Sequence, residues 1–248
     1  SFSDGTGDSG GGNQTTEVKR EAGSFIPDGA KYTVKATNTI LEGNGTNKFP
    51  DTPATNDTYE EGDYVYTYNK GTQYGVQYGT EWSAVVKDKT KTEYEPLISE
   101  IAGKPLTNVC GAFYNCTSLI TAPAIPNSVT DMSGAFDSCT SLTTAPDMSN
   151  ANSITKMEYT FNACASLTTA PTIPSSVTSM NCTFIGCESL TTAQTIPSSV
   201  TNMQYTFADC KSLTGTIEIN ANPTEYYECF KNTQITGITG SCSQATKD

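Results

Sequence analysis

The second half of the chain repeats one phrase, F-x-x-C-x-S-L, five times at nearly constant spacing. The copies begin at Phe113, Phe136, Phe161, Phe184 and Phe207, with a longer step only from the second copy to the third. A degenerate sixth copy follows at Phe230. A fixed period of about 23 residues is typical of a solenoid, in which each unit buries its apolar face only against its neighbours. The repeat therefore favours an extended binding or spacer surface over a catalytic pocket.

Each unit extends on both sides of this phrase. Met usually stands four residues before Phe, and Val or Ile stands three residues before that. After Leu the first four copies continue with x-T-A, usually followed by Pro and then by Ile-Pro. We expect the Val, Met, Phe, Cys and Leu side chains to point inward. Burial of a Val, Met, Phe or Leu side chain stabilises by roughly 1.5–3 kcal/mol, so about six coils hold a continuous core.

These positions also predict local structure. Leu119 to Ile125, with its equivalents, is predicted to form a short strand that pairs in parallel with the next coil. Phe-x-x-Cys is predicted to be a tight helical turn, because residues three apart share one side of such a turn. The longer step carries two additional residues between Pro146 and Ile154, which we expect in a surface loop.

The chain before the repeat divides into three predicted parts. Residues 1–24 are rich in Gly, Ser, Thr, Asp and Asn, and we interpret them as a flexible tether. Residues 25–80 are interpreted as a small Tyr-rich β module, in which Tyr64-Val65-Tyr66-Thr67-Tyr68 places three tyrosines on one side of a strand. Residues 81–108 are interpreted as an amino-terminal cap, and residues 109–248 as the solenoid with a carboxyl-terminal cap.

The cap is predicted to contain a strand and a helix. Trp82 to Val86 has the pattern of a strand. Apolar residues at Tyr94, Leu97, Ile98 and Ile101 follow the i, i+3, i+4, i+7 spacing of a helix. Pro within the first turn and Gly after the last residue suit the two ends of such a helix.

Composition excludes several classes of function. The formal net charge of −12 argues against binding nucleic acid through a basic surface. The absence of histidine removes the commonest general base and the commonest transition-metal ligand, so we predict no enzymatic activity and no cofactor. No apolar run approaches the length that a transmembrane segment needs.

The repeat resembles the BspA-like leucine-rich repeats of bacterial and some protozoan surface proteins. The resemblance rests on V-T-x-M, F-x-x-C-x-S-L and I-P-x-S within residues 106–219. It implies a right-handed leucine-rich-repeat solenoid, export, and a role in adhesion or interaction with host or neighbouring cells. The chain departs from the commonest form of the family by having Ala-Pro where a larger aliphatic residue usually starts the strand. We expect an extracellular or surface-anchored protein whose signal segment is absent from this chain.

The nine cysteines raise the question of a metal site or of disulfide bonds. Five of them occupy one repeat position and are predicted to be small buried thiols, since stacked parallel side chains have poor disulfide geometry. No C-x-x-C pair or histidine supplies a metal site. Cys110, Cys182, Cys229 and Cys242 lie outside this ladder, and a bridge between Cys229 and Cys242 stays open as an alternative.

A threonine ladder precedes each inward alanine and should face solvent. With the residues beside it, this ladder is a candidate surface for a partner, although Thr is also a common exposed strand residue. The candidate residues are Thr121, Pro123, Thr144, Pro146, Thr169, Pro171, Thr192 and Gln194.

The sequence thus favours a non-enzymatic, exported protein that mediates adhesion or protein interaction through the exposed strand face of the solenoid. The partner would be a protein or a glycan on a host or neighbouring cell surface, bound by many weak contacts. The alternative is that the solenoid is a stalk and the Tyr-rich module binds glycan. In that alternative, Tyr64, Tyr66 and Tyr68 would stack on sugar rings, whereas such a row more often forms the packed face of a sheet.

Overall fold

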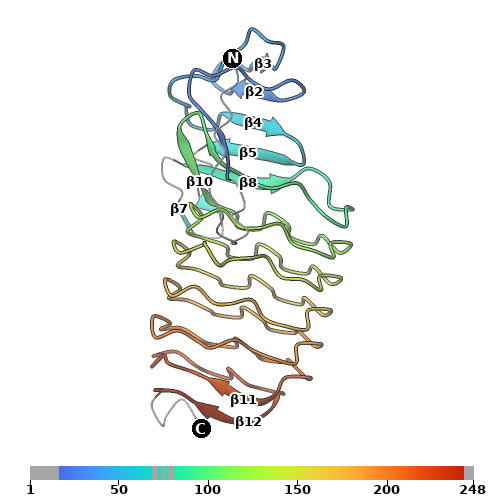
Figure 1. Cartoon of the computed structure of the whole chain (residues 1–248), viewed down its shortest axis with the longest axis vertical. Helices are drawn as coiled ribbons and strands as arrows, with labels where there is room; N and C mark the ends of the chain where they lie inside the picture. Colours follow the sequence, from blue (N-terminus) through green and yellow to red (C-terminus); the bar gives the residue numbers. More distant parts are fainter. Residues whose placement is uncertain (1–16, 69–71, 74–75, 78–80, 243–248) are drawn as a thin grey trace, which may run out of the picture.

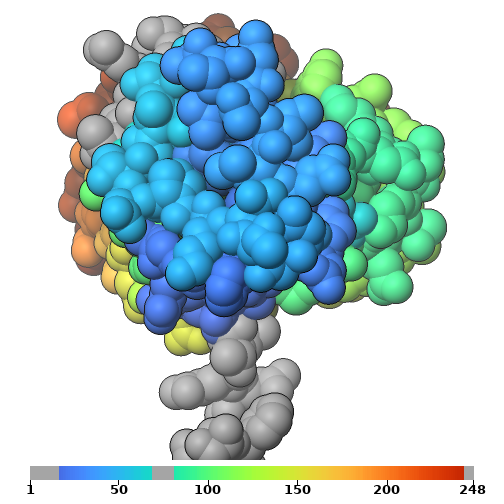
Figure 2. All heavy atoms as spheres, turned by 90° about the horizontal axis from the view of Figure 1, so that it is seen from above, coloured from blue at the N-terminus to red at the C-terminus, as the bar shows by residue number. Residues whose placement is uncertain are grey.

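The Tyr-rich amino-terminal part forms a β-sheet at one end of an elongated molecule, and the repeats stack from that sheet to the other end (Figure 1). This arrangement is seen in a computed structural model that describes residues 17–68, 72–73, 76–77 and 81–242. Seen from the amino-terminal end, the sheet covers the first coils of the stack (Figure 2). The molecule is therefore strand-rich and built along one axis.

The main sheet has eight strands in the order β1-β9-β10-β8-β5-β4-β2-β3. Two-stranded pairs are formed by β6 with β7 and, at the carboxyl-terminal end, by β11 with β12. The bounds are β1 Val18–Arg20, β2 Lys31–Val34, β3 Thr39–Glu42, β4 Thr58–Glu61, β5 Tyr64–Tyr68, β6 Thr72–Gln73, β7 Val76–Gln77, β8 Trp82–Val86, β9 Ile98–Ile101, β10 Lys104–Asn108, β11 Thr214–Glu218 and β12 Gln234–Thr239.

The predicted tyrosine row is strand β5, and its rings face the core. Tyr64, Tyr66 and Tyr68 are 1%, 0% and 4% exposed, as expected for alternate residues of a strand with one buried face. The ring of Tyr68 packs against that of Trp82 on the neighbouring strand β8, with the ring centroids 5.2 Å apart. This row is therefore the packed face of a sheet.

The predicted helix over Tyr94–Ile101 is wrong, and no helix forms in the described residues. Ile98–Ile101 is instead strand β9, which pairs in parallel with β1 and in antiparallel with β10. Ala102 and Gly103 join β9 to β10 with φ of 49° and 69°, the conformation that a two-residue hairpin turn requires. Apolar residues at this spacing fit a short buried strand as well as a helix. The hairpin turn at Ala102 and Gly103 selects the strand.

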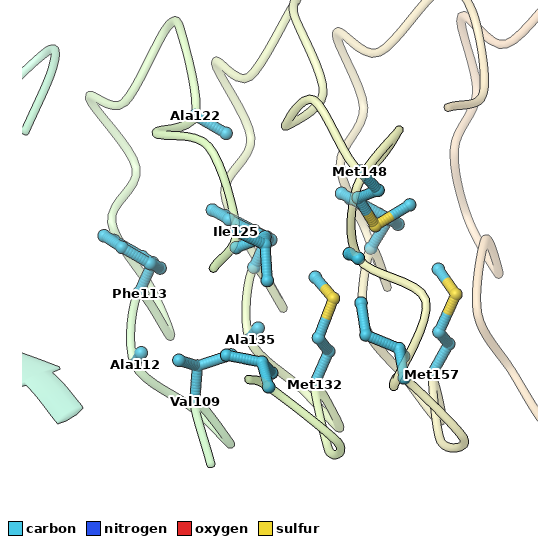
Figure 3. Close-up of a cluster of buried hydrophobic side chains, with 14 of the residues drawn as sticks. Val109, Ala112, Phe113, Ala122, Ile125, Met132, Ala135, Met148 and Met157 are labelled. Carbon is cyan, nitrogen blue, oxygen red and sulfur yellow. The ribbon is translucent and has the colours of Figure 1, made fainter. Parts of the chain in front are cut away.

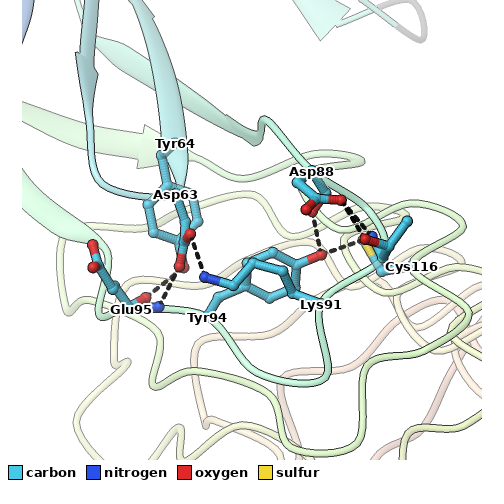
Figure 4. A network of polar contacts seen from close by, with 8 residues as sticks. Asp63, Tyr64, Asp88, Lys91, Tyr94, Glu95 and Cys116 are labelled. Carbon is cyan, nitrogen blue, oxygen red and sulfur yellow. Dashed lines mark hydrogen bonds and ion pairs between the residues drawn. The ribbon is translucent and has the colours of Figure 1, made fainter.

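The first coil is covered by strands and a loop, which take the place of the expected helix. The Val86 amide at the end of β8 donates to the Ala112 carbonyl at 3.1 Å, as a preceding coil would. The rings of Tyr64 and Tyr94 contact Phe113, with centroid distances of 6.0 and 5.3 Å. Figure 4 shows this junction, where the Tyr94 hydroxyl donates to the Cys116 sulfur at 3.4 Å.

The domain boundaries proposed above stay predictions. Residues 1–16 of the predicted tether lie outside the described residues, and Val18–Arg20 of the same segment form β1. β8 of the predicted cap pairs with β5 of the predicted module, so a single sheet runs across that boundary.

The repeats stack through one column of phenylalanine rings. Neighbouring rings lie 4.9–5.7 Å apart between centroids and within 3–6° of parallel. The Phe113 amide donates to the Ala135 carbonyl of the next coil at 2.8 Å, and this bond recurs down the stack. Figure 3 shows Val109, Met132 and Met157 filling the same interior. The predicted inward positions are confirmed, since the core phenylalanines from Phe113 to Phe207 are fully buried.

The Phe-x-x-Cys segment is a single β-turn, in which the Cys amide donates to the Phe carbonyl, and not the predicted helical turn. In every coil the residues two before and two after Phe have φ between 47° and 73°. This left-handed conformation on both sides of the phenylalanine is incompatible with a continuing right-handed helix. The positions hold Gly, Asn, Ser and Asp but also Tyr and Ala, so residue type alone does not reveal the turn.

The predicted strand after each Leu is reduced to isolated bridges in the middle coils. Thr121 pairs with Thr144 and Thr169 with Thr192, in parallel as expected. Pro123, Pro146 and Pro171 follow within two residues and lack the N–H that a continued ladder needs. In the last full copy, Leu213-Thr214-Gly215-Thr216-Ile217, the Pro is absent and the strand β11 forms and pairs with β12. The fourth copy has Gln194 in place of Pro and still forms only isolated bridges, so proline alone does not set the strand length.

Phe161→Ala should lower the free energy of unfolding by about 3–5 kcal/mol, because it removes a buried ring that is stacked on both faces. Denaturant unfolding followed by circular dichroism measures the change. Thr168→Ala, on an exposed side chain of the same coil, is the control and should change the value by less than about 0.5 kcal/mol. A loss below about 1 kcal/mol for Phe161→Ala would contradict the stacked core.

Candidate functional site

The predicted threonine ladder is exposed. Thr121, Thr144, Thr169 and Thr192 all lie at the surface, on successive coils. The residues before them form a second exposed column, which sequence reasoning missed: Ile120, Thr143, Thr168, Thr191 and Thr214. We call the two columns together the threonine face. Their spacing follows the coil-to-coil hydrogen bonds, so the face is held by the backbone.

The other predicted members of this surface contribute less. Pro123 and Pro146 are buried, and Pro171 and Gln194 are half-buried. Of the eight candidate residues, the threonines therefore supply the accessible surface.

A groove of about 660 Å³ opens beside the first coil. Its floor is apolar, with Leu97 and Ile125 at 3% and 5% exposure. Three asparagines on its rim, Asn127, Asn150 and Asn152, are exposed, and their side-chain amides have no hydrogen-bond partner among the described residues. The full lining is Glu17, Pro96, Leu97, Ser99, Ala124, Ile125, Pro126, Asn127, Asn150 and Asn152.

The groove arises where the repeat is irregular. Asn150 and Asn152 belong to the segment between Pro146 and Ile154 that makes one step of the repeat longer than the others. The opposite wall comes from Glu17 and the start of β9, and the Glu17 carboxylate accepts a hydrogen bond from the Asn127 backbone amide at 3.3 Å. Sequence reasoning placed the insertion in a loop but missed the groove, because the facing wall is distant in sequence.

The groove combines two kinds of recognition. An asparagine side chain offers both a donor and an acceptor, so it can bond to the backbone amides of an extended peptide. The Leu and Ile floor can cover an apolar side chain of the same ligand. The volume is within the range of small-ligand and peptide sites, and the described residues that line it include no aromatic ring.

The ladder cysteines are packing groups. None of the nine cysteines forms a disulfide and all are buried, so the alternative Cys229–Cys242 bridge is not formed. Four ladder thiols donate to the carbonyl of the Phe in the preceding coil at 3.1–3.2 Å: Cys139, Cys164, Cys187 and Cys210. Burial raises the pKa of the Cys139 and Cys210 thiols to about 12. These groups are held as thiols, which are poor nucleophiles and poor metal ligands.

Acidic and cysteine side chains do not converge on a metal in the part of the chain that the structure describes. No group of three or more Cys, Asp or Glu side chains there has the geometry to hold a metal ion. Nor does that part contain a helix that could cross a membrane.

The repeat region matches a known sequence family. Residues 107–220 and 173–235 each match the family described as "Mycoplasma protein of unknown function, DUF285". Together the two matches span just over half of the 248 residues. The chain belongs to this family. The family description assigns no function, and no curated protein matches the chain.

The fold of this DUF285 chain is similar to that of solved leucine-rich repeat proteins. A leucine-rich repeat protein from T. pallidum aligns with a TM-score of 0.51 at 24% identity, over 70% of this chain and 84% of that chain. A leucine-rich repeat protein from Bacteroides ovatus aligns with a TM-score of 0.43 at 19% identity, over 69% of this chain and 51% of that chain. The first likeness gives this chain the leucine-rich repeat fold, as the resemblance to BspA-like repeats implied.

Ladder thiols in the folded protein should react with iodoacetamide at pH 8 about a thousandfold more slowly than a free cysteine, because burial suppresses the thiolate. Mass spectrometry of labelled peptides measures the rate at each position. All nine cysteines should label quickly in guanidinium chloride. The native rates should rise about tenfold per pH unit between pH 8 and 10, since the pKa lies above that range. Rapid native labelling of Cys139 or Cys210 would contradict this environment.

Proposed function

We propose that this chain is a non-enzymatic interaction protein that binds an extended segment of a partner protein. The observation that carries the proposal is the groove beside the first coil, with its apolar floor and three asparagine amides that no described residue engages. The leucine-rich repeat fold supports it, because stacked coils present broad surfaces in place of one deep pocket. The threonine face supplies further weak contacts on the same rigid scaffold.

The net charge of the chain limits the kinds of partner segment that suit its surface. The net charge of −12 repels polyanions, and Glu17 adds a carboxylate to the groove. A neutral or basic segment therefore suits the surface better than an acidic one. The glycan-binding alternative in the amino-terminal module loses its support, because Tyr64, Tyr66 and Tyr68 are buried and offer no ring to a sugar.

The proposal includes export and adhesion. The resemblance to BspA-like surface proteins supports both, and it supports a description of the repeats as about six coils of a right-handed solenoid. In this proposal the protein lies outside the cell or is anchored to its surface, where the threonine face and groove meet a host or neighbouring cell. Adhesion then rests on many weak contacts along the stack.

Substitutions on the two surfaces should reduce attachment of protein-coated beads to an epithelial monolayer by about tenfold. Thr169→Lys with Thr192→Lys tests the threonine face, and Asn150→Ala with Asn152→Ala tests the groove. Bound beads are counted under flow. Thr155→Lys with Thr178→Lys is the matched control, because these exposed threonines lie on another column and the charge change is the same.

All of these variants should keep the melting temperature of the parent chain, since the substituted side chains are exposed. Attachment that stays unchanged in both test pairs would contradict the proposal. Loss in one pair only would assign attachment to that surface.

Surface exposure is tested separately in the organism that makes the protein. Intact cells should bind an antibody against the folded chain, and brief protease treatment of intact cells should remove that signal. A cytoplasmic enzyme measured in parallel controls for cell lysis. Labelling that appears only after permeabilisation would contradict export.

A further inference from the structure

A second surface of the solenoid carries exposed tyrosines beside fixed polar side chains. It lies on the turn that precedes each buried Phe. Tyr159 is 45% exposed, Tyr227 is 62% exposed and Tyr205 is half-buried. The positions of the first two coils equivalent to Tyr159 hold Gly111 and Gly134, so the aromatic surface is confined to the later coils.

Coil-to-coil hydrogen bonds bring these tyrosines into one strip. The Tyr159 amide donates to the Asn181 carbonyl at 3.0 Å, and the Tyr205 amide donates to the Tyr227 carbonyl at 3.0 Å. Between them, the Cys182 amide donates to the Gln204 carbonyl at 2.8 Å. The rings of Tyr205 and Tyr227 meet edge to face with centroids 5.5 Å apart. The three tyrosines therefore lie on the same side of the stack. The coil that contains Asn181 and Cys182 lies between Tyr159 and Tyr205 and is hydrogen-bonded to both of their coils.

Polar side chains beside the tyrosines are held in place by one another. The Asn202 and Gln204 side-chain amides both donate to the same Glu225 oxygen, at 2.7 and 3.1 Å. On the neighbouring coils, the Ser179 hydroxyl donates to Glu158 at 2.8 Å. The Gln204 side-chain oxygen, the Asn181 side-chain nitrogen and one oxygen of each glutamate have no hydrogen-bond partner among the described residues. These groups are positioned to meet a ligand without reorganising.

We infer that this strip, defined by Tyr159, Tyr205 and Tyr227 with Asn181 and Gln204, binds a neutral glycan. A pyranose ring has an apolar C–H face that stacks on an aromatic ring and a rim of hydroxyls that needs nearby donors and acceptors. The strip offers both in alternation along the stack. Its carboxylates and the acidic chain oppose sulfated or phosphorylated polymers. This site goes beyond the proposed peptide groove and uses different residues.

The direction of the strip also suits a chain-like ligand. Parallel strands repeat at about 4.8 Å, so Tyr159 and Tyr205, two coils apart, stand about 9.6 Å from each other along the stack. A β-linked hexose chain advances by a similar distance per two sugars. One oligosaccharide laid along the solenoid axis can therefore contact both tyrosines, while the amides of the intervening coil bond to its hydroxyls.

Affinity electrophoresis of the whole chain through gels that contain β-1,3-glucan, β-1,4-glucan or β-1,4-mannan tests the inference. Retardation by at least one of these neutral polymers is expected. Tyr159→Ala and Tyr205→Ala should each weaken the retained interaction by about tenfold, through loss of one stacked ring. Gln204→Ala should weaken it by about fivefold, through loss of one hydrogen-bonding group.

Tyr114→Ala is the matched control, because Tyr114 is similarly exposed, at 44%. It follows Phe113 in the first coil, whereas the tyrosines of the strip precede the Phe of their coils. The control variant should leave retardation unchanged. Tyr227→Ala is a further test variant that removes the most exposed ring and should fold normally, as a thermal melt will verify. Absence of retardation by every polymer, or retardation that Tyr159→Ala, Tyr205→Ala and Tyr227→Ala all leave unchanged, would overturn the inference.

Discussion

Contact between equivalent residues of successive coils is the interaction on which the rest of the structure depends. Each core Phe from Phe113 to Phe207 lays its ring on the next Phe and donates its amide to the carbonyl before that residue. The hydrogen bond sets the register, and the ring sets the separation. Because each coil is fixed in this way to its neighbour, every other position of the unit becomes a column, either buried or exposed.

The columns divide the chain between packing and recognition. Ladder thiols and the buried threonines Thr160, Thr183 and Thr206 donate to carbonyls of the preceding coil, so these polar atoms inside the stack are satisfied. The phrase that makes the repeat visible is thus almost wholly occupied with holding it together. Surfaces suited to ligands occur where the unit varies, in the asparagine-rich insertion and in the tyrosines of the later coils.

Particular residues show how far the sequence can predict the fold. The alternation in Tyr64–Tyr68 and the constant spacing of the phenylalanines each depend on local geometry, so the strand and the stack are predictable. The strand at Ile98–Ile101 is not predictable in this way, because its apolar residues fit the periodicity of a helix as well as that of a short strand. Its pairing with β1 and β10 decides for the strand and involves residues outside this stretch of sequence. The short strands after each Leu are a similar case, since their length depends on pairing with the next coil, which lies outside the same window of sequence.

The sequence by itself determined the repeat, its buried positions, the exposed threonine column and the absence of a histidine-based site, because these depend on residue type and period alone. Only the tertiary structure decided which surfaces are concave or aromatic. The groove needs Glu17 and Leu97 to face Asn150 and Asn152, and the tyrosine strip needs Tyr159 and Tyr205 to stand on the same side of the stack. Such proximity is set by the hydrogen bonds between coils and by the sheet that covers the first of them, which no single window of sequence contains.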